Sequence, residues 1–219
     1  YTFDHAPAPV MVLMPTLDSR DAWKAQKLNP LLQDTPVIRD LLGGQRSRDA
    51  ANSKDMIDFP GGVLFLAGGN SPNSYAQSSV RYLIMDDLDR FPGEVGEEGD
   101  PVALAKGRTK AFARAKRLFI STPTVQGESL IERGHAESDQ RRYHVACPHC
   151  HTYQPLEWGG PETEHGIKWR ANETGLDAWY VCAHCHGEIH EHHKPGMLAG
   201  GRWIATHPER SVRGYHISA

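Results

Sequence analysis

The N-terminal part of the chain carries short apolar runs separated by polar and glycine-containing segments. Val10–Met14 and Val63–Ala67 are uninterrupted apolar stretches, and Tyr82–Met85 is a third. In Arg117–Ile120, one basic residue precedes three apolar ones, and this stretch is predicted to be a fourth strand. An uninterrupted run of this length is typical of a strand buried on both faces, as in parallel sheets. Because helical or loop segments separate the runs, the pattern predicts an α/β fold with a mostly parallel sheet.

Two of the intervening segments have the composition of helices. We expect the first helix to be capped by Asp18 or Ser19 and to end before Pro30, which cannot continue a helix. The second is expected from Val102 to Lys116, leading directly into the fourth strand. The stretch from Gly43 to Lys54 is predicted to be a polar loop.

Polar or small residues follow each of the four predicted strands. In open parallel sheets, ligands bind beyond the carboxyl ends of the strands, so these residues are expected to line one binding edge. Hydroxyls, carboxylates and glycines of this kind suit a small charged ligand. The strand ends read Pro15-Thr16, Gly68-Gly69-Asn70, Asp86-Asp87 and Ser121-Thr122.

The pair Asp86-Asp87 directly follows an apolar strand. In nucleotide hydrolases an acid at this place orients the Mg²⁺ bound to the nucleotide, and a second group positions the attacking water. Asp86 is the candidate for the first role and Asp87 for the second, with Asp89 a further candidate in the same loop. Such short motifs also occur where acids simply cap a turn, and this interpretation stays open.

Ser121, Thr122 and Thr124 follow another apolar strand, where hydroxyls are able to report the loss of a γ-phosphate to the rest of the protein. A plain Ser/Thr turn before Pro123 is the alternative. The chain contains no Gly-Lys dipeptide, so the G-x-x-x-x-G-K-[ST] phosphate loop is absent from it. Either the fold is unrelated to that of phosphate-loop ATPases, or the phosphate loop lies upstream of Tyr1. We expect the second, with this segment inactive by itself.

Composition divides the chain into two parts. Of 13 histidines in 219 residues, only His5 precedes residue 135, and all four cysteines lie in the C-terminal part. Such a change suggests two structural units, which we place at residues 1–142 and 143–219. The first unit would contain the predicted sheet, and the second the cysteines and most of the histidines.

The cysteines form two C-x-x-C pairs with 31 residues between them. Four thiolates in two such turns surround Zn²⁺ tetrahedrally, which predicts a closed structural site. Disulfides or a redox dithiol are the alternatives; no export signal is visible, and a redox motif would not be expected twice. The surrounding histidines are interpreted as solvated. The predicted ligands are Cys147, Cys150, Cys182 and Cys185.

Charge adds one local feature. The net charge is only −3, so overall electrostatics do not indicate nucleic-acid binding, and no apolar run approaches the ~20 residues of a membrane span. Basic residues nevertheless cluster on the second predicted helix and the strand after it. They are either a solvated helix face or contacts to the DNA backbone, with Arg108, Lys110 and Arg114 as the candidates.

Taken together, the order and spacing of these motifs resemble the large terminase subunit of tailed bacteriophages, in its GpA-like branch. The resemblance covers nearly the whole chain and includes Pro15-Thr16, the two C-x-x-C pairs and Gly201-Arg-Trp203. Its longest matching stretches are Phe65-Leu-Ala-Gly-Gly-Asn-Ser-Pro72, Val80-Arg-Tyr-Leu-Ile-Met-Asp-Asp-Leu-Asp-Arg-Phe-Pro92 and Ile120-Ser-Thr-Pro-Thr124.

This resemblance implies a RecA-like ATPase that packages viral double-stranded DNA into a procapsid. It implies ATP and Mg²⁺ as cofactors beside structural Zn²⁺, and as partners the small terminase subunit, the capsid portal and further copies of the chain, with no membrane. The location would be the host cytoplasm. Asp86 corresponds to the Mg²⁺-orienting acid, Asp87 to a position usually held by Glu, and Ser121-Thr122-Pro123 to the motif that couples hydrolysis to movement. The family's nuclease acids are absent from this segment.

A second function class is a zinc-ribbon interaction module without enzymatic activity, in which the α/β part is a scaffold. It predicts that a longer chain still fails to hydrolyse ATP and that a chelator abolishes partner binding.

Overall fold

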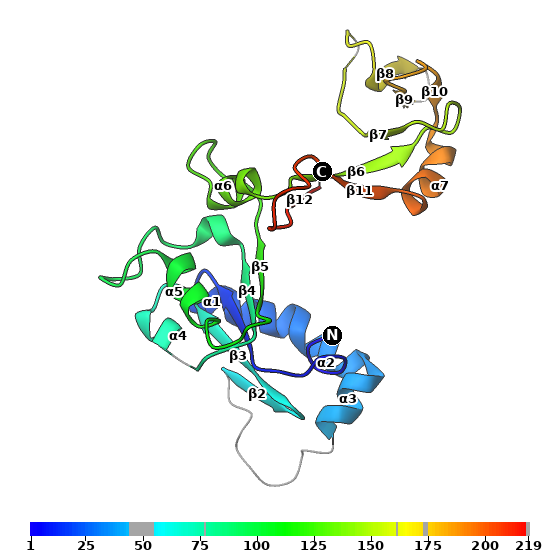
Figure 1. Cartoon of the computed structure of the whole chain (residues 1–219). Helices are drawn as coiled ribbons and strands as arrows, with labels where there is room; N and C mark the ends of the chain where they lie inside the picture. Colours follow the sequence, from blue (N-terminus) through cyan, green and yellow to red (C-terminus); the bar gives the residue numbers. More distant parts are fainter. Residues whose placement is uncertain (44–54, 77, 161, 173–174, 218–219) are drawn as a thin grey trace. The chain divides into compact units, whose positions relative to one another are not determined.

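The computed structural model describes residues 1–43, 55–76, 78–160, 162–172 and 175–217. These residues form two compact units, Tyr1–Ile131 and Glu132–Ala219 (Figure 1). The division follows Ile131, whereas the change in composition led us to place it after Arg142. The predicted polar loop falls almost entirely on residues 44–54, which lie outside the described residues.

The first unit is built on a five-stranded sheet in the order β2-β3-β1-β4-β5. The central strand β1 (Val10–Met14) runs parallel to β3 (Gly62–Gly68) and to β4 (Tyr82–Asp86), and β4 runs parallel to β5 (Lys116–Ile120). Only the edge strand β2 (Met56–Phe59) is antiparallel in this sheet. The predicted α/β class with a mostly parallel sheet is confirmed.

Each face of this sheet packs against its own core. Val10, Val12 and Met14 point into one core and Met11 and Leu13 into the other, because successive side chains of a strand alternate between its faces. The first core includes residues of α3 (Pro36–Gly43) and of the helical segment before it, which contains α1 (Leu17–Trp23) and α2 (Asn29–Asp34). The second core includes residues of α4 (Pro72–Ala76) and α5 (Pro101–Gly107) (Figure 1). Burial on both faces explains the uninterrupted apolar runs.

The first helix differs from the prediction at both ends. Its N-cap is Thr16, and Ser19 closes a capping box with it: Thr16 Oγ1 accepts the Ser19 N–H at 3.1 Å, and Ser19 Oγ accepts the Thr16 N–H at 3.0 Å. Pro30 does not end the helical segment. A π-helical turn at Lys24–Leu28 precedes it, and Pro30 lies in the first turn of α2, a position at which proline is tolerated.

The second predicted helix is shorter than expected. Residues 101–107 form α5, Gly107 ends it, and the Arg108 and Thr109 N–H groups donate to carbonyls three residues earlier. The basic residues that follow therefore lie in turns and on β5, not on a helix face. Strand β5 is also not buried as predicted, because it is the edge of the sheet; Leu118 and Ile120 are 52% and 45% exposed.

The second unit contains two small sheets. The first pairs β9 (Gly175–Val181) with β8 (Gly166–Asn172) and β10 (Glu188–Ile189), all antiparallel. In the second, β6 (Arg141–Ala146) pairs with three strands. The unit also contains α7 (Lys194–Ala199) and all of α6 (Leu130–Glu137) except its first two residues, which belong to the first unit. The partners of β6 are β7 (Tyr153–Pro155), β11 (Arg202–Ala205) and β12 (Tyr215–His216).

None of the described helices is long and apolar enough to cross a bilayer.

Candidate functional site

The carboxyl ends of the parallel strands in the first unit meet at one edge of the sheet. The register pairs Met14 with Gly68 and Asp86 with Ile120, so all four strands end at the same level. The Gly69 N–H continues this pairing by donating to the Met14 carbonyl at 2.7 Å. The edge is thus lined by the polar residues that follow the strands, as their sequence positions indicated.

Glycines at the end of β3 allow close packing at this edge. A Cβ atom on Gly69 would lie 2.2 Å from the Phe91 ring, and one on Gly68 would lie 2.7 Å from the backbone nitrogen of Leu17. Two side chains of α4 fix the same segment: Ser74 Oγ donates to the Gly68 carbonyl at 2.6 Å, and Tyr75 Oη donates to the Gly69 carbonyl at 2.9 Å. Burial raises the pKa of Tyr75, which keeps its hydroxyl a donor.

Asp86 and Asp87 occupy different environments at the end of β4. Asp86 is half-buried, its Oδ1 accepts the Asp87 N–H at 3.2 Å, and no ion pair joins it to a basic residue of the described part of the chain. Its carboxylate oxygens therefore remain available to a hard cation such as Mg²⁺. Asp87 is exposed in the left-handed region (φ 57°), and its Oδ2 lies 4.0 Å from Arg90 Nε.

The unusual backbone of Asp87 has a local cause. It lets the chain reverse after β4, so that Leu88 returns into the second core and the turn Leu88–Arg90 can form. Aspartate adopts this conformation more readily than most residues.

Asp89 connects this turn to the segment after β5. Its Oδ2 accepts the Thr124 N–H at 3.0 Å and its Oδ1 accepts the Ile131 N–H at 2.9 Å, while its own N–H donates to Ser121 Oγ at 3.1 Å. The hydroxyl of buried Ser129 also bonds to it. Partial burial opposes ionisation, but the hydrogen bonds outweigh it and hold the pKa of Asp89 below its usual range.

The predicted coupling residues lie in different positions within this segment. Ser121 is half-buried and contacts the acidic turn through Asp89, and Thr124 is held by the Asp89 carboxylate. Thr122 is exposed, and its carbonyl accepts the Ser121 hydroxyl at 3.2 Å. The structure thus joins Asp89, Ser121 and Thr124 directly; Asp86 is linked to them through the same short turn.

The four cysteines of the second unit converge. Their Sγ atoms all lie within 4.8 Å of one another; Cys147 and Cys185 are 3.8 Å apart, and Cys150 and Cys182 are 3.9 Å apart. A tetrahedral site with Zn–S bonds of about 2.3 Å has S···S edges of about 3.8 Å. All four thiols are free, so the cluster fits a metal ion of this size and preference.

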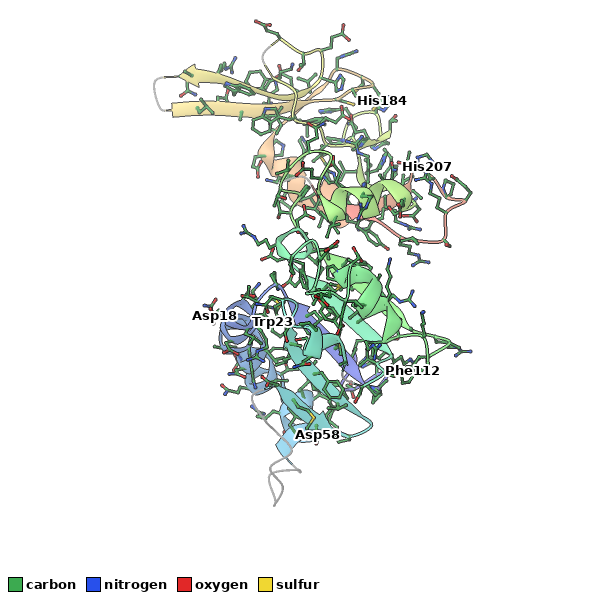
Figure 2. All side chains as sticks on the ribbon, turned by 90° about the vertical axis from the view of Figure 1, so that its left-hand side faces the viewer. Asp18, Trp23, Asp58, Phe112, His184 and His207 are labelled. Carbon is green, nitrogen blue, oxygen red and sulfur yellow. The ribbon has the colours of Figure 1, made fainter. Side chains whose placement is uncertain are left out.

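The two cysteine pairs have the same backbone geometry. In each, the residue after the second cysteine, His151 or His186, is left-handed, and its N–H donates to the carbonyl of the first cysteine. The N–H groups of His149 and His184 donate to the first sulfur of their pairs at 3.4 Å. Backbone donors of this kind stabilise thiolate charge, and neither histidine belongs to the ligand cluster; both are exposed (His184, Figure 2).

Gln154 is a residue that the sequence analysis did not identify. It is 1% exposed, its Nε2 donates to Cys182 Sγ at 3.2 Å, and its Oε1 accepts the Ala183 N–H at 2.9 Å. Burial alone would raise the pKa of Cys182, but the N–H groups of Cys185 and His184 and the Gln154 amide outweigh it and lower the pKa to about 6. In the sequence, the only indication of this role of Gln154 is that a glutamine follows a C-x-x-C pair.

The three candidate DNA contacts lie between α5 and β5. Arg108 follows the end of α5 and is half-buried, whereas Lys110 and Arg114 are exposed in the turns that follow. Arg117, on β5, instead donates to Thr109 Oγ1 at 2.8 Å.

Comparison with solved structures finds large terminases at low similarity. The large terminase of a thermophilic bacteriophage is 18% identical with a TM-score of 0.34, covering 53% of this chain and 26% of that one. The ATPase domain of the Thermus phage P74-26 large terminase is 14% identical with a TM-score of 0.35, covering 56% of this chain and 51% of that one.

Two phage proteins are similar in sequence to most of this chain. The terminase large subunit of Enterobacteria phage P21 is 30% identical over 208 residues, which is 93% of this chain and 32% of that protein. The terminase large subunit of Escherichia phage lambda is 31% identical over 188 residues, which is 84% of this chain and 29% of that protein. The chain thus spans about a third of these relatives. The sequence model of the family described as phage terminase large subunit gpA, ATPase domain, matches residues 1–203, and the chain belongs to this family.

Proposed function

We propose that this chain is the central and C-terminal part of the ATPase domain of a DNA-packaging motor, which hydrolyses ATP to move double-stranded viral DNA into a procapsid. The observation that carries the proposal is the acidic turn Asp86–Asp89 at the carboxyl edge of a parallel sheet, bonded to the Ser121–Thr124 segment. Membership of the terminase family supports the same activity.

In this proposal the residues of the edge have separate roles. Asp86, whose carboxylate forms no ion pair with a described basic residue, would hold a Mg²⁺ ion, which would supply charge neutralisation at the nucleotide phosphates. Asp87 orients and deprotonates the attacking water. Ser121, Thr122 and Thr124 sense the γ-phosphate, and Asp89 transmits their movement to the start of α6 through Ile131.

Zinc is proposed for the cysteine cluster. Cys147, Cys150, Cys182 and Cys185 are the ligands, and the site is structural because four thiolates leave no open position. Elemental analysis should find about one zinc per chain, and a chelator should unfold the second unit. Zinc-free protein with an intact second unit would contradict the assignment.

The remaining assignments follow from the proposed motor. Residues 1–142 would form the ATPase core, and residues 143–219 the zinc-ribbon region. Arg108, Lys110 and Arg114 would contact the DNA backbone. The small terminase subunit, the capsid portal and further copies of the chain would be partners in the host cytoplasm.

The hydrolytic assignment is tested in the full-length protein by measuring DNA-stimulated ATP hydrolysis. Asp86→Asn and Asp87→Ala should each lower the turnover rate by at least about 100-fold, since each removes a group acting on the transition state. Asp40→Asn, an exposed change on α3, is the matched control and should keep the rate. Equal rates in Asp87→Ala and the unmodified protein would refute the role of Asp87.

A further inference from the structure

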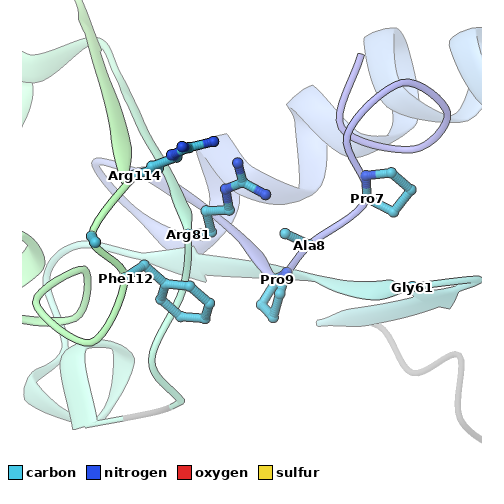
Figure 3. A pocket seen from close by; sticks show the side chains of 8 residues that line it. Pro7, Ala8, Pro9, Gly61, Arg81, Phe112 and Arg114 are labelled. Carbon is cyan, nitrogen blue, oxygen red and sulfur yellow. The ribbon is translucent and has the colours of Figure 1, made fainter.

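A cavity of about 500 Å³ opens at the opposite edge of the same sheet, where the parallel strands begin (Figure 3). Pro9 directly precedes β1, Arg81 directly precedes β4, and Arg114 lies just before β5, and all three line the cavity together with Phe112. Because parallel strands begin at one edge and end at the other, this cavity is separated from Asp86 by the length of β4.

The backbone around the cavity is fixed by hydrogen bonds. The Arg81 N–H donates to the Pro9 carbonyl at 2.9 Å, and the Lys116 N–H donates to the Arg81 carbonyl at 2.9 Å. On the far wall, Gly61 has a φ of +85°, and a Cβ atom there would lie 2.7 Å from the Pro7 Cβ. The cavity is therefore lined by the segments that lead into the strands, and the hydrogen bonds of the sheet hold the backbone of these segments in place.

The described lining of this cavity contains two arginines and no acidic residue. The side chains of Arg81 and Arg114 extend into the same opening (Figure 3), and neither forms an ion pair with a carboxylate in the part of the chain that the structure describes. In the neighbouring turn, the Nε atom of Arg108 is buried without a hydrogen-bond partner among the described residues. Concentrated positive charge of this kind attracts anions.

The chemistry of the lining indicates which anion fits. A guanidinium presents a planar pair of donors that matches phosphate geometry, and two of them together neutralise a phosphate better than one. Phe112 and Pro9 add an apolar wall below the charged groups (Figure 3), suited to the flat face of a base. The volume falls within the range of small-ligand sites, about 300–1,000 Å³.

We propose that Arg81 and Arg114 form a phosphate-binding site for a nucleotide unit, with Phe112 and Pro9 against its apolar part. The unit is either one nucleotide of a DNA strand or a free nucleotide, since both present the same phosphate and base. Binding of a DNA strand here rests on the proposed packaging function, whereas binding of a free nucleotide does not.

The test uses the full-length protein with Arg81→Gln and Arg114→Gln combined, and Lys27→Gln with Arg39→Gln as a control of equal charge on the first helical segment and α3. Binding of a single-stranded oligodeoxynucleotide, whose bases are free to lie against Phe112, is measured across a salt series, and binding of 2′-deoxyadenosine monophosphate is measured with saturating ADP to fill the Asp86 site. We expect the arginine variant to bind the DNA strand about tenfold more weakly, with a salt slope smaller by about 0.7 for each phosphate that it no longer neutralises.

The two measurements distinguish the sources of the phosphate. Loss of DNA affinity in the arginine variant, but not in the control, supports a DNA strand as the ligand. Loss of monophosphate binding alone supports a free nucleotide. If both affinities match those of the control variant, the proposal is wrong.

A second variant, at the exposed Arg114 alone, tests the proposal without disturbing the packing of Arg81. The Arg81 guanidinium lies 5.3 Å from the Tyr82 ring and packs against it, whereas Arg114 is exposed, so Arg114→Glu should fold normally, which its melting temperature checks. This single charge reversal should weaken phosphate binding relative to the wild type. Unchanged binding would overturn the proposal. Retained hydrolysis in Asp86→Asn would instead refute the proposed function and leave this site standing.

Discussion

The Asp89 carboxylate accepts the backbone N–H of Thr124 at 3.0 Å, which joins the turn after β4 to the segment after β5. The same carboxylate accepts the Ile131 N–H at 2.9 Å. One side chain thus links the acidic turn, the Ser121–Thr124 segment and the first residues of α6. If the segment senses nucleotide hydrolysis, Asp89 is the group through which the signal leaves the site.

We expect Asp89→Ala to uncouple the two functions of the motor. The substitution leaves Asp86 and Asp87 in place but removes the acceptor for two backbone N–H groups, so ATP hydrolysis should fall less than DNA translocation. It should also lower the free energy of unfolding by about 1–3 kcal/mol, the usual cost of losing hydrogen bonds to a charged group. Hydrolysis and translocation assays on one preparation, with a denaturant titration, measure both effects.

A useful control is Asp34→Ala, which removes an exposed carboxylate at the end of α2. It should leave hydrolysis, translocation and stability unchanged. An Asp89→Ala protein that translocates DNA as fast as the control would contradict the linking role.

The same hydrogen bonds predict a pH dependence. Because they lower the pKa of Asp89 in the folded protein, its contribution to stability is fully present above the ordinary aspartate pKa of about 3.9. The contribution is lost as the pH falls from there through the lowered pKa of the folded state. Thermal unfolding of the wild type and of Asp89→Asn should therefore show a stability difference that shrinks below about pH 4. A difference that stays constant between pH 6 and pH 3 would contradict this origin.

The sheet could be predicted because its signal is local. Strands β1, β3 and β4 are buried on one or both faces and appear as apolar runs, and their carboxyl ends identify the binding edge. Strand β2 gave no such signal, since it is short, antiparallel and buried on alternate residues only. The end of α5 at Gly107 was not predicted because the basic residues after it are good helix formers. The edge position of β5 was not predicted because it depends on the order of the strands in the sheet, which no local sequence pattern indicates.

The cysteine cluster was predictable because each half of it carries the same recognisable motif, although the two halves lie 31 residues apart in the sequence. The C-x-x-C spacing was sufficient to expect the convergence of four thiols, and the structure brings them together. The hydrogen bonds of Asp89 to Thr124 and Ile131 span 35 and 42 residues, and that of Gln154 to Ala183 spans 29. Such long-range partners depend on the folded arrangement, so Gln154 escaped the sequence analysis and the contacts of Asp89 were not foreseen.

Gln154 should tune the affinity of the cysteine cluster for metal. Gln154→Leu removes the N–H donated to Cys182 and leaves the Ala183 N–H without its acceptor. Loss of a residue that hydrogen-bonds to a metal ligand typically lowers metal affinity by about 10–100-fold. The variant should therefore lose zinc to a chromogenic chelator at a correspondingly lower chelator concentration. Gln126→Leu, at an exposed position, should match the wild type, and equal zinc retention in both variants would show that Gln154 has no such role.

Gly69 should tolerate no side chain. Its missing Cβ would lie 2.2 Å from the Phe91 ring, and Phe91 is a buried member of the second core. Phe91 also directly follows the acidic turn, where its N–H donates to the Leu88 carbonyl at 3.1 Å. Gly69→Ala should therefore lower the free energy of unfolding by about 1–3 kcal/mol and also slow ATP hydrolysis. Gly93→Ala is the matched control, because no atom lies within 4 Å of the added methyl group. Denaturant titration and hydrolysis assays on the two variants measure the difference, and a Gly69→Ala protein as stable and active as Gly93→Ala would show that the turn does not depend on this close contact.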